Sequence, residues 1–224
     1  MSNEKPWLLL YLDGPMQSWG HQSRFQRRTT LAFPTKSGVI GMVCAALGLA
    51  RDDRVMISKL AGLRLETYVL MSGRRMTDYH TVGGGYDPKT EHQRMAMKVD
   101  GTTPDTVVTF REYLLEAKFA VLMNGEERLL ERAESALMNP KWGVWLGRKS
   151  CVPASIIAQG RFVSQEEALQ SVEALSGRKP VRRILEAAAF GEGTDTVHDV
   201  PVNFSTREFT VRRIADVPLP VETS

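Results

Sequence analysis

A continuous apolar run near the start of the chain, Trp7-Leu8-Leu9-Leu10-Tyr11-Leu12, constrains the fold more than any other feature. The run stops at Asp13-Gly14-Pro15, residue types that interrupt regular structure. A short apolar run without polar alternation is typical of a strand buried on both faces, so we expect a strand over residues 6–13. This segment therefore belongs to the core of the protein.

The patterns that follow alternate between helix and strand. Apolar residues at helical spacing predict a helix over residues 36–50, with Thr35 or Ser37 as its N-cap. Further patterns predict strands over residues 63–71 (with alternating polarity), 106–110 and 118–123, and an amphipathic helix over residues 126–138. This order resembles the β-α-β-β-α-β plan, so the expected fold class is α+β with a ferredoxin-like (RRM-like) domain.

Residues 72–106 have a different character, because they are rich in charge, contain Gly83-Gly84-Gly85 and have almost no aliphatic run. So long a segment without a core signal is typical of a functional or disordered loop. The C-terminal third is expected to contain strands over residues 155–163 and 209–214, a helix over residues 165–175, an ambiguous segment over residues 179–190 and a frayed tail over residues 217–224.

The composition permits nucleic-acid binding without requiring it. The 224 residues carry a formal net charge of +3 and a pI of about 8.9, so any nucleic-acid site must concentrate basic residues on one face. Cys44 and Cys151 are too few and too far apart for a metal site, and His21, His92 and His198 show no ligand spacing. We expect no metal, no cofactor, no membrane span and a cytoplasmic location.

Two neighbouring segments carry the first candidate site. The turn Gly14-Pro15-Met16-Gln17-Ser18-Trp19-Gly20 offers an amide and an indole between glycines, which suits hydrogen bonding and stacking with RNA bases through Gln17 and Trp19. Arg24, Arg27 and Arg28 follow, and Lys36 and Ser37 open the predicted helix. Guanidinium groups and a helix N-terminus suit phosphates, so we expect these five residues to contact RNA.

A second candidate site is the turn Gly147-Arg148-Lys149-Ser150. Gly147 lets the backbone approach a ligand closely, and Arg148 and Lys149 supply positive charge. We expect all four residues of this turn to lie at the RNA site. The alternative without a ligand is an ordinary tight turn whose charged side chains are solvated.

Five motifs occur in a fixed order along the chain: Gly14–Gly20, Phe33–Gly38, Asp78–Val82, Phe110–Leu114 and Trp145–Cys151. Together they closely resemble the Cas-five family of the RAMP superfamily, over roughly residues 7–213. The resemblance implies a subunit of the type I-E CRISPR complex called Cascade. It also adds Tyr79, His80 and Arg111 to the expected RNA-binding residues.

The resemblance further implies how the domains are arranged along the chain. Residues 1–140 are expected to form the ferredoxin-like RAMP domain, with a long thumb, either a hairpin or a loop, inserted at about residues 73–109. Residues 141–224 are expected to hold the glycine-rich loop and a small, mostly β C-terminal part. The implied partners are the 5′ handle of the CRISPR RNA, the repeated backbone subunit and the large PAM-recognising subunit, with target DNA reached only through the RNA.

Two alternatives remain: a scaffold whose basic patches contact only other subunits, and an enzyme. Tyr79 and His80, with Lys89 or Lys98, could form an acid–base set for metal-independent cleavage of CRISPR RNA, as relatives of the type I-C system do. Adjacent residues on a strand point to opposite faces, which argues against such a set. We therefore expect a non-catalytic RNA-binding subunit.

Overall fold

The computed structural model describes residues 5–21, 26–82, 107–189 and 191–220. Its helices are α1 (Lys36–Leu47), α2 (Arg54–Ala61), α3 (Glu127–Met138) and α4 (Gln165–Ser176). Its longer strands are β1 (Trp7–Asp13), β6 (Arg64–Met71), β7 (Arg74–Val82), β8 (Val107–Leu115), β9 (Lys118–Asn124), β10 (Ala158–Phe162), β11 (Arg182–Glu186), β12 (Asp195–Asn203) and β13 (Glu208–Pro218). Four two-residue strands complete it, β2 (Met16–Gln17), β3 (Trp19–Gly20), β4 (Arg27–Arg28) and β5 (Thr30–Leu31).

A seven-stranded antiparallel sheet forms the body of the protein, in the order β10-β1-β9-β6-β11-β13-β12. The fold is thus a mixed α/β one with mostly antiparallel sheets. Strands from both sides of residue 140 share this sheet, since β10 pairs with β1 and β11 pairs with β6. None of the helices among the described residues is long and apolar enough to cross a bilayer.

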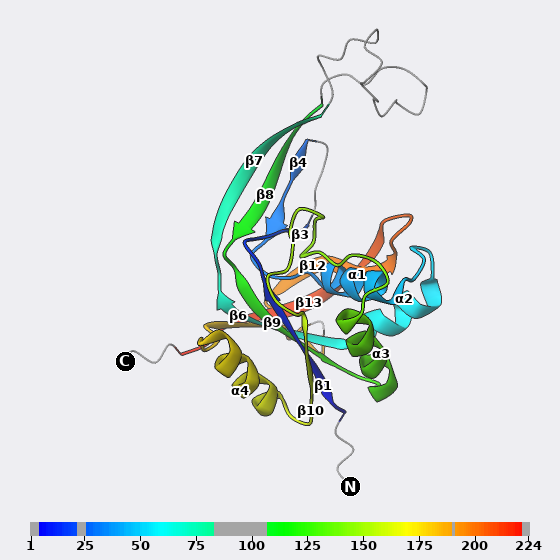
Figure 1. Ribbon diagram of the computed structural model, residues 1–224, viewed down its shortest axis with the longest axis vertical. Coiled ribbons are helices and arrows are strands. Elements are labelled where there is room, and N and C mark those ends of the chain that lie inside the picture. The colour runs from blue at the N-terminus through cyan, green and yellow to red at the C-terminus, as the bar shows by residue number, and fades with distance from the viewer. Residues whose placement is uncertain (1–4, 22–25, 83–106, 190, 221–224) are drawn as a thin grey trace.

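The predicted burial of the first strand is confirmed. Leu8, Leu10 and Leu12 pack in one core cluster with residues of α1, α2 and α3, whereas Leu9 and Tyr11 pack in a second cluster with residues of α4. Figure 1 shows α4 apart from the other three helices, across the sheet. Full burial of one such leucine side chain contributes about 1.5–3 kcal/mol of transfer free energy. The apolar run therefore holds two layers to one sheet.

The helices predicted at residues 36–50, 126–138 and 165–175 are also confirmed, within a few residues at their ends. Thr35 is the N-cap of α1, because its hydroxyl accepts a hydrogen bond from the backbone N–H of Gly38 at 3.2 Å. Gly48 ends the helix at a positive φ of 68°. The alternating strand at residues 63–71 forms, but Glu66 and Tyr68 on its polar side are buried too, because α4 covers that face.

Several sequence expectations are wrong. Residues 72–82 are not all loop, since β7 occupies Arg74–Val82, and residues 111–113 do not break a strand, since β8 runs continuously. The ambiguous segment contains β11, and the tail is paired as far as Pro218. Helix α2 and strand β12 were not predicted. Gly83-Gly84-Gly85 and the rest of residues 83–106 lie outside the described residues.

Strands β7 and β8 form a long antiparallel pair that we call the ribbon, and it extends away from the main body (Figure 1). Strand β4 lies along β8 in parallel and β2 pairs with the base of β8. Because side chains on both faces of the ribbon meet solvent, its sequence lacks the apolar alternation of a half-buried strand. This is why the sequence predicted a loop for β7.

Candidate nucleic-acid interface

The Gly14–Gly20 turn places its two candidate side chains inside the protein. Gln17 and Trp19 are both fully buried. The Gln17 amide nitrogen donates to the carbonyl oxygens of Leu12 at 3.0 Å and Ala117 at 2.7 Å, and its oxygen accepts from the Trp19 indole N–H at 3.1 Å. The two side chains expected to face RNA are therefore turned inward, and their polar groups are paired within the fold.

The first turn of α1 is neutralised from within the protein. The backbone N–H of Lys36 donates to the Asp199 carboxylate at 2.7 Å, and the Lys36 ammonium lies 2.8 Å from the Glu186 carboxylate. Burial lowers the pKa of Lys36, and the Glu186 carboxylate opposes that shift. Lys36, expected to bind phosphate, is instead paired with protein carboxylates, which occupy the positions that an anion would take.

A buried arginine completes this cluster. Arg212 donates to both oxygens of Asp199, at 2.7 and 2.9 Å, and to Glu186 at 2.8 Å. Burial alone would lower the pKa of Arg212, but its bonds to these two carboxylates raise it. The cluster, which joins α1 to β11, β12 and β13, is structural.

The glycine-rich turn, Gly147–Ser150, packs closely against the Gly14–Gly20 turn. Gly147 has a positive φ of 95°, and a Cβ there would overlap the carbonyl oxygen of Ser18. The Ser18 N–H donates to the carbonyl oxygen of Leu146 at 3.0 Å. Gly147 therefore serves the approach of two protein segments, which leaves no need of a ligand to explain it.

Arg148 also binds the protein. Its guanidinium donates to the carbonyl oxygens of Glu112 at 3.1 Å and Arg28 at 2.9 Å, and lies 4.7 Å from the centroid of the Tyr113 ring. It anchors the turn on β4 and β8. The next two residues, Lys149 and Ser150, are exposed.

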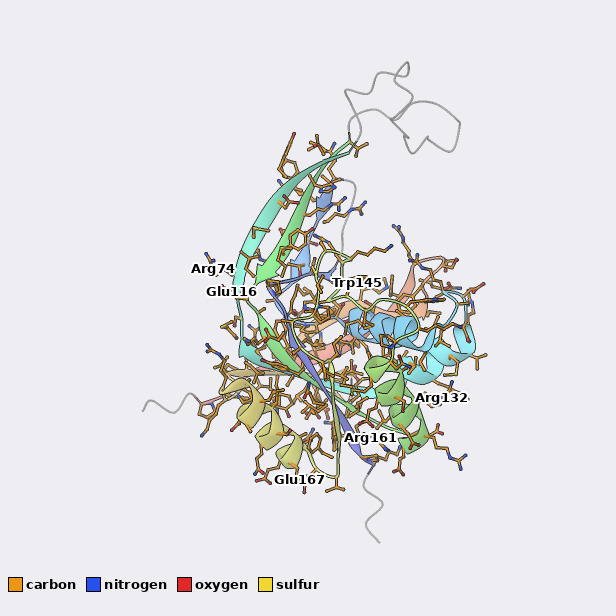
Figure 2. The ribbon with its side chains drawn as sticks, in the orientation of Figure 1. Arg74, Glu116, Arg132, Trp145, Arg161 and Glu167 are labelled. Carbon is orange, nitrogen blue, oxygen red and sulfur yellow. The ribbon has the colours of Figure 1, made fainter. Side chains whose placement is uncertain are left out.

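The ribbon and β4 bring together most of the other residues that the sequence predicted to bind RNA. Register places Arg27, Phe110 and Tyr79 side by side on three adjacent strands. Tyr79 is 61% exposed and Phe110 39% exposed, and their rings meet edge to face at 5.6 Å. Figure 2 shows that side chains along the ribbon stand clear of the helices.

The next row of the same strands carries Arg28, Arg111 and Asp78. The Arg111 Nε donates to the Thr109 hydroxyl at 3.1 Å, whereas the Arg27 and Arg28 guanidinium groups have no hydrogen bond or ion pair with any described residue. We use the name ribbon surface for the exposed and half-exposed side chains on the two faces of these strands: Arg27, Tyr79 and Phe110 on one face, and Arg28, His80 and Arg111 on the other. Arg24 lies outside the described residues.

The two residues of the enzyme alternative do not converge. Tyr79 and His80 are neighbours in β7 and point to opposite faces, and His80 Nδ1 lies 3.8 Å from the Asp78 carboxylate. Lys89 and Lys98 lie outside the described residues. Within the described ranges, no three His, Cys, Asp or Glu side chains gather as metal ligands would.

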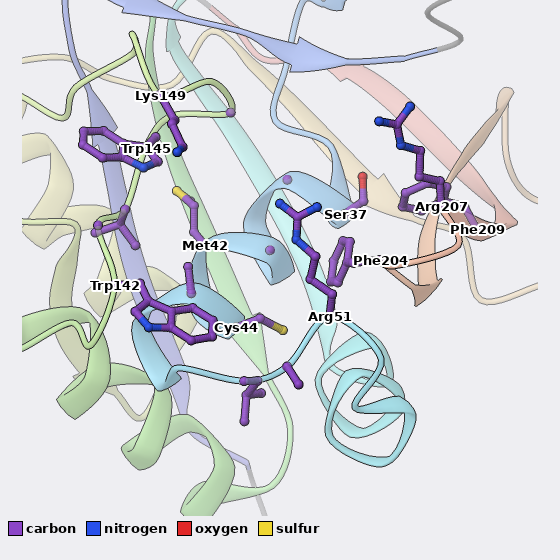
Figure 3. A pocket seen from close by; sticks show the side chains of 18 residues that line it. Ser37, Met42, Cys44, Arg51, Trp142, Trp145, Lys149, Phe204, Arg207 and Phe209 are labelled. Carbon is purple, nitrogen blue, oxygen red and sulfur yellow. The ribbon is translucent and has the colours of Figure 1, made fainter. Parts of the chain in front are cut away.

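The sequence missed a groove beside α1. Its cavity of about 520 Å³ is lined by Ser37 and Lys149, by two tryptophans of the segment before the glycine-rich turn and by two phenylalanines of the β12–β13 hairpin (Figure 3). The signal in the sequence was the pair Trp142 and Trp145, two aromatic residues three apart around a glycine. Ser37 is thus brought to Lys149, while Lys36 next to it is buried.

Comparisons with known proteins converge on one family. The family described as "CRISPR-associated protein (Cas_Cas5)" matches residues 7–215. The Cascade subunit CasD of Escherichia coli K12 is 28% identical over 228 residues, which cover 96% of this chain and 91% of that protein.

Two solved structures agree. A chain of a CRISPR RNA-guided surveillance complex superposes with a TM-score of 0.77 at 32% identity, covering 96% of this chain and 90% of that one. A Cas protein crystal structure superposes with a TM-score of 0.66 at 35% identity, covering 96% and 95%. Since the family match spans nearly the whole described chain, this protein belongs to the Cas5 family of CRISPR-associated proteins.

Proposed function

We propose that this chain is the subunit of a type I-E Cascade complex that holds the 5′ handle of the CRISPR RNA, and that it acts by binding. Its similarity to CasD supports a place in Cascade, and its likeness to a chain of an RNA-guided surveillance complex supports a role beside RNA. The implied partners are the repeated backbone subunit and the large PAM-recognising subunit.

The observation that carries the proposal is the ribbon surface. Arg27 and Arg28 are unpaired within the described part of the chain. Arg27 lies in the row of the exposed rings of Tyr79 and Phe110, and Arg28 lies in the next row, beside Arg111. Cations that follow a backbone next to rings that stack on bases are the usual means of holding single-stranded RNA. Lys149, on the turn anchored to the same strands, extends this surface.

We also propose that β1, α1, β6, β9, α3 and β10 form the ferredoxin-like unit. The strand order β10-β1-β9-β6, with α1 and α3 packed on the same face, supports this. Helix α4 covers the opposite face, the one on which RRM domains stack RNA bases. The RNA site is accordingly placed on the ribbon, and the ribbon is proposed as the base of a thumb spanning about residues 73–109 that contacts the first backbone subunit.

The divergence of Tyr79 and His80 supports binding over catalysis. A strand that sends the two side chains to opposite faces does not present both to one phosphodiester. Phosphate contacts would position the handle, and base contacts would distinguish it from other RNA.

A salt titration of RNA binding tests the proposal. The full chain, a double variant Arg27→Ala and Lys149→Ala, and the control Arg132→Ala on α3, away from the ribbon (Figure 2), are titrated with labelled handle RNA at several salt concentrations. Each cation that no longer neutralises a phosphate should lower the slope of log K against log salt by about 0.7. A double variant with wild-type affinity and slope would remove the ribbon surface from the RNA site.

A further inference from the structure

The groove beside α1 is built from three segments that are remote in sequence. Helix α1 forms its floor, the segment Trp142–Lys149 one wall, and the turn between β12 and β13 the other (Figure 3). The backbone N–H groups of Phe204 and Ser205 donate to the carbonyl oxygen of Arg51, at 3.0 and 3.2 Å, and hold that turn against the end of α1. The walls are therefore fixed by the fold itself.

The groove combines flat apolar surface with unpaired positive charge. Of the 18 residues that line it, four are aromatic (Trp142, Trp145, Phe204 and Phe209), three are cationic (Arg51, Lys149 and Arg207), and none is Asp or Glu. None of the three cations has a side-chain hydrogen bond or ion pair within the described ranges. Burial raises the pKa of the Cys44 thiol in the floor to about 12, so the floor stays uncharged at neutral pH.

A glycine in the floor has no packing reason to be there. A Cβ at Gly41 would meet only the Phe204 ring, at 3.7 and 3.8 Å, which is ordinary van der Waals contact. Glycine inside a helix costs about 1 kcal/mol relative to alanine. At Gly38, by contrast, a Cβ would lie 2.8 Å from the Trp19 ring. Gly41 therefore keeps the groove open without serving the core.

A cation in the wall is held in an unfavourable backbone conformation. Arg207 has a positive φ of 56°, where a side chain other than glycine costs about 1–2 kcal/mol. The turn does not require an arginine, since the Asn203 side chain holds it by accepting from the N–H groups of Ser205 and Thr206. Strain of this kind is a reason to look for a ligand.

We infer that this groove receives an unstacked nucleobase of single-stranded RNA, its ring against Trp142 and its flanking phosphates beside Arg51, Lys149 and Arg207. Trp142 is 49% exposed and offers a stacking face. The cations without carboxylates favour an anionic occupant, and flat apolar walls favour a ring. Lys149 joins the groove to the ribbon surface, because Arg148 beside it is bound to β4 and β8.

This inference rests on the proposed function and names where one base of the same RNA goes. If one base stacks on Trp142, removal of that base and removal of the Trp142 ring should each lower RNA affinity by the same factor, and removal of both should lower it no further. The experiment therefore scans the handle RNA with single abasic nucleotides against the full chain and its variants. Binding of the intact RNA to the wild-type chain is measured first.

One abasic position should lower wild-type affinity roughly tenfold. Trp142→Ala should lower affinity for intact RNA by a similar factor and make that abasic position neutral. Trp142→Phe should keep near-normal affinity but show less quenching of tryptophan fluorescence by RNA, with Trp145 in the same groove as the remaining reporter. Gly41→Leu, which fills the floor while keeping every charge, should behave as Trp142→Ala does.

A matched glycine pair separates charge from backbone strain. Arg207→Gly should weaken RNA binding without lowering the melting temperature, because it removes the cation and relieves the positive φ. Glu116→Gly is the control, since Glu116 has a φ of 58° in the turn between β8 and β9, outside the groove. It should leave RNA binding unchanged.

The outcomes distinguish the two proposals. Failure of the wild-type chain to bind intact handle RNA overturns the proposed function and this inference with it. Tight binding without any abasic position coupled to Trp142 overturns the groove site alone. Variants that bind RNA normally but fail to assemble with the other subunits would assign the groove to an acidic segment of a protein partner and overturn the inference.

Discussion

At the scale of single residues, burial decides which basic side chains can bind a ligand. Lys36 and Lys149 are both lysines next to a serine, yet Lys36 is 5% exposed and paired with Glu186 while Lys149 faces the groove. Arg148 likewise donates to protein carbonyls, whereas Arg27 is exposed. Lys36 and Arg148, which have partners inside the protein, hold in place the segments that expose Lys149 and Arg27.

We predict that Asp199 is among the most costly residues to replace. It is 2% exposed. Removal of its carboxylate leaves the Lys36 N–H without its acceptor and leaves the buried Arg212 guanidinium with Glu186 alone. Breaking a buried pair in this way costs about 3–5 kcal/mol. Urea unfolding of Asp199→Ala should show a loss of that size, and Asp199→Asn, which keeps one acceptor oxygen, a smaller one. A loss below about 1 kcal/mol in Asp199→Ala would show that the cluster does not hold α1 to the sheet.

At the scale of elements, the outer part of the ribbon is proposed to bind RNA but contributes little to the stability of the protein's body. Its outer part has little apolar surface to bury, and its strands are held chiefly by their own pairing, nine residues of β7 against nine of β8. The buried side chains of the two cores come from other elements or from the base of β8. Changes on the outer ribbon should therefore leave the body of the protein intact.

The double variant Tyr79→Ala and Phe110→Ala should lower handle-RNA affinity by roughly tenfold or more, since each stacked base contributes about 1–3 kcal/mol. Its free energy of unfolding should fall by no more than about 1.5 kcal/mol, because both rings are partly exposed and the loss is chiefly that of their edge-to-face contact. Fluorescence anisotropy and urea unfolding measure the two quantities. Val211→Ala, 57% exposed on β13, serves as the control. Wild-type RNA affinity in the double variant would exclude stacking on the ribbon.

At the scale of the whole molecule, one sheet with helices on both faces supports two further features that hold the proposed contacts: the sheet of the ribbon with β2 and β4, and the groove beside α1. The N-terminal strands, the glycine-rich turn and the C-terminal hairpin all contribute to the groove or to the ribbon surface. Such a surface, assembled from distant segments, suits the holding of an extended ligand. It also depends on the complete fold.

We predict that the purified chain does not cleave CRISPR RNA precursor. His80 and Tyr79 lie on opposite faces of β7, so neither can pair with the other as acid and base on one phosphodiester. Incubation with precursor RNA in EDTA, followed by denaturing gel electrophoresis, should show only intact RNA, for the wild type and for His80→Ala alike. A discrete product that His80→Ala abolishes would support the endoribonuclease alternative.

Local sequence patterns were sufficient to predict the elements that are buried and periodic. The strand at residues 6–13 and the helices at residues 36–50, 126–138 and 165–175 follow from apolar spacing, which persists because the core is made of these elements. The motif order also identified the family. Helix α2 had a signal that was overlooked, since Asp53 caps it by accepting from the N–H of Met56 at 3.0 Å.

Which candidate residues face outward could be learned only from the folded chain. The hydrogen-bond partners of the Gln17 and Trp19 side chains cannot be deduced from the sequence, because one of them, Ala117, is 100 residues away along the chain. The ribbon and the groove left no periodic signal, because one is solvated on both faces and the other is assembled from three remote segments. Apolar periodicity reports burial within one segment, whereas a site is defined by contacts between segments, and those exist only once the chain has folded.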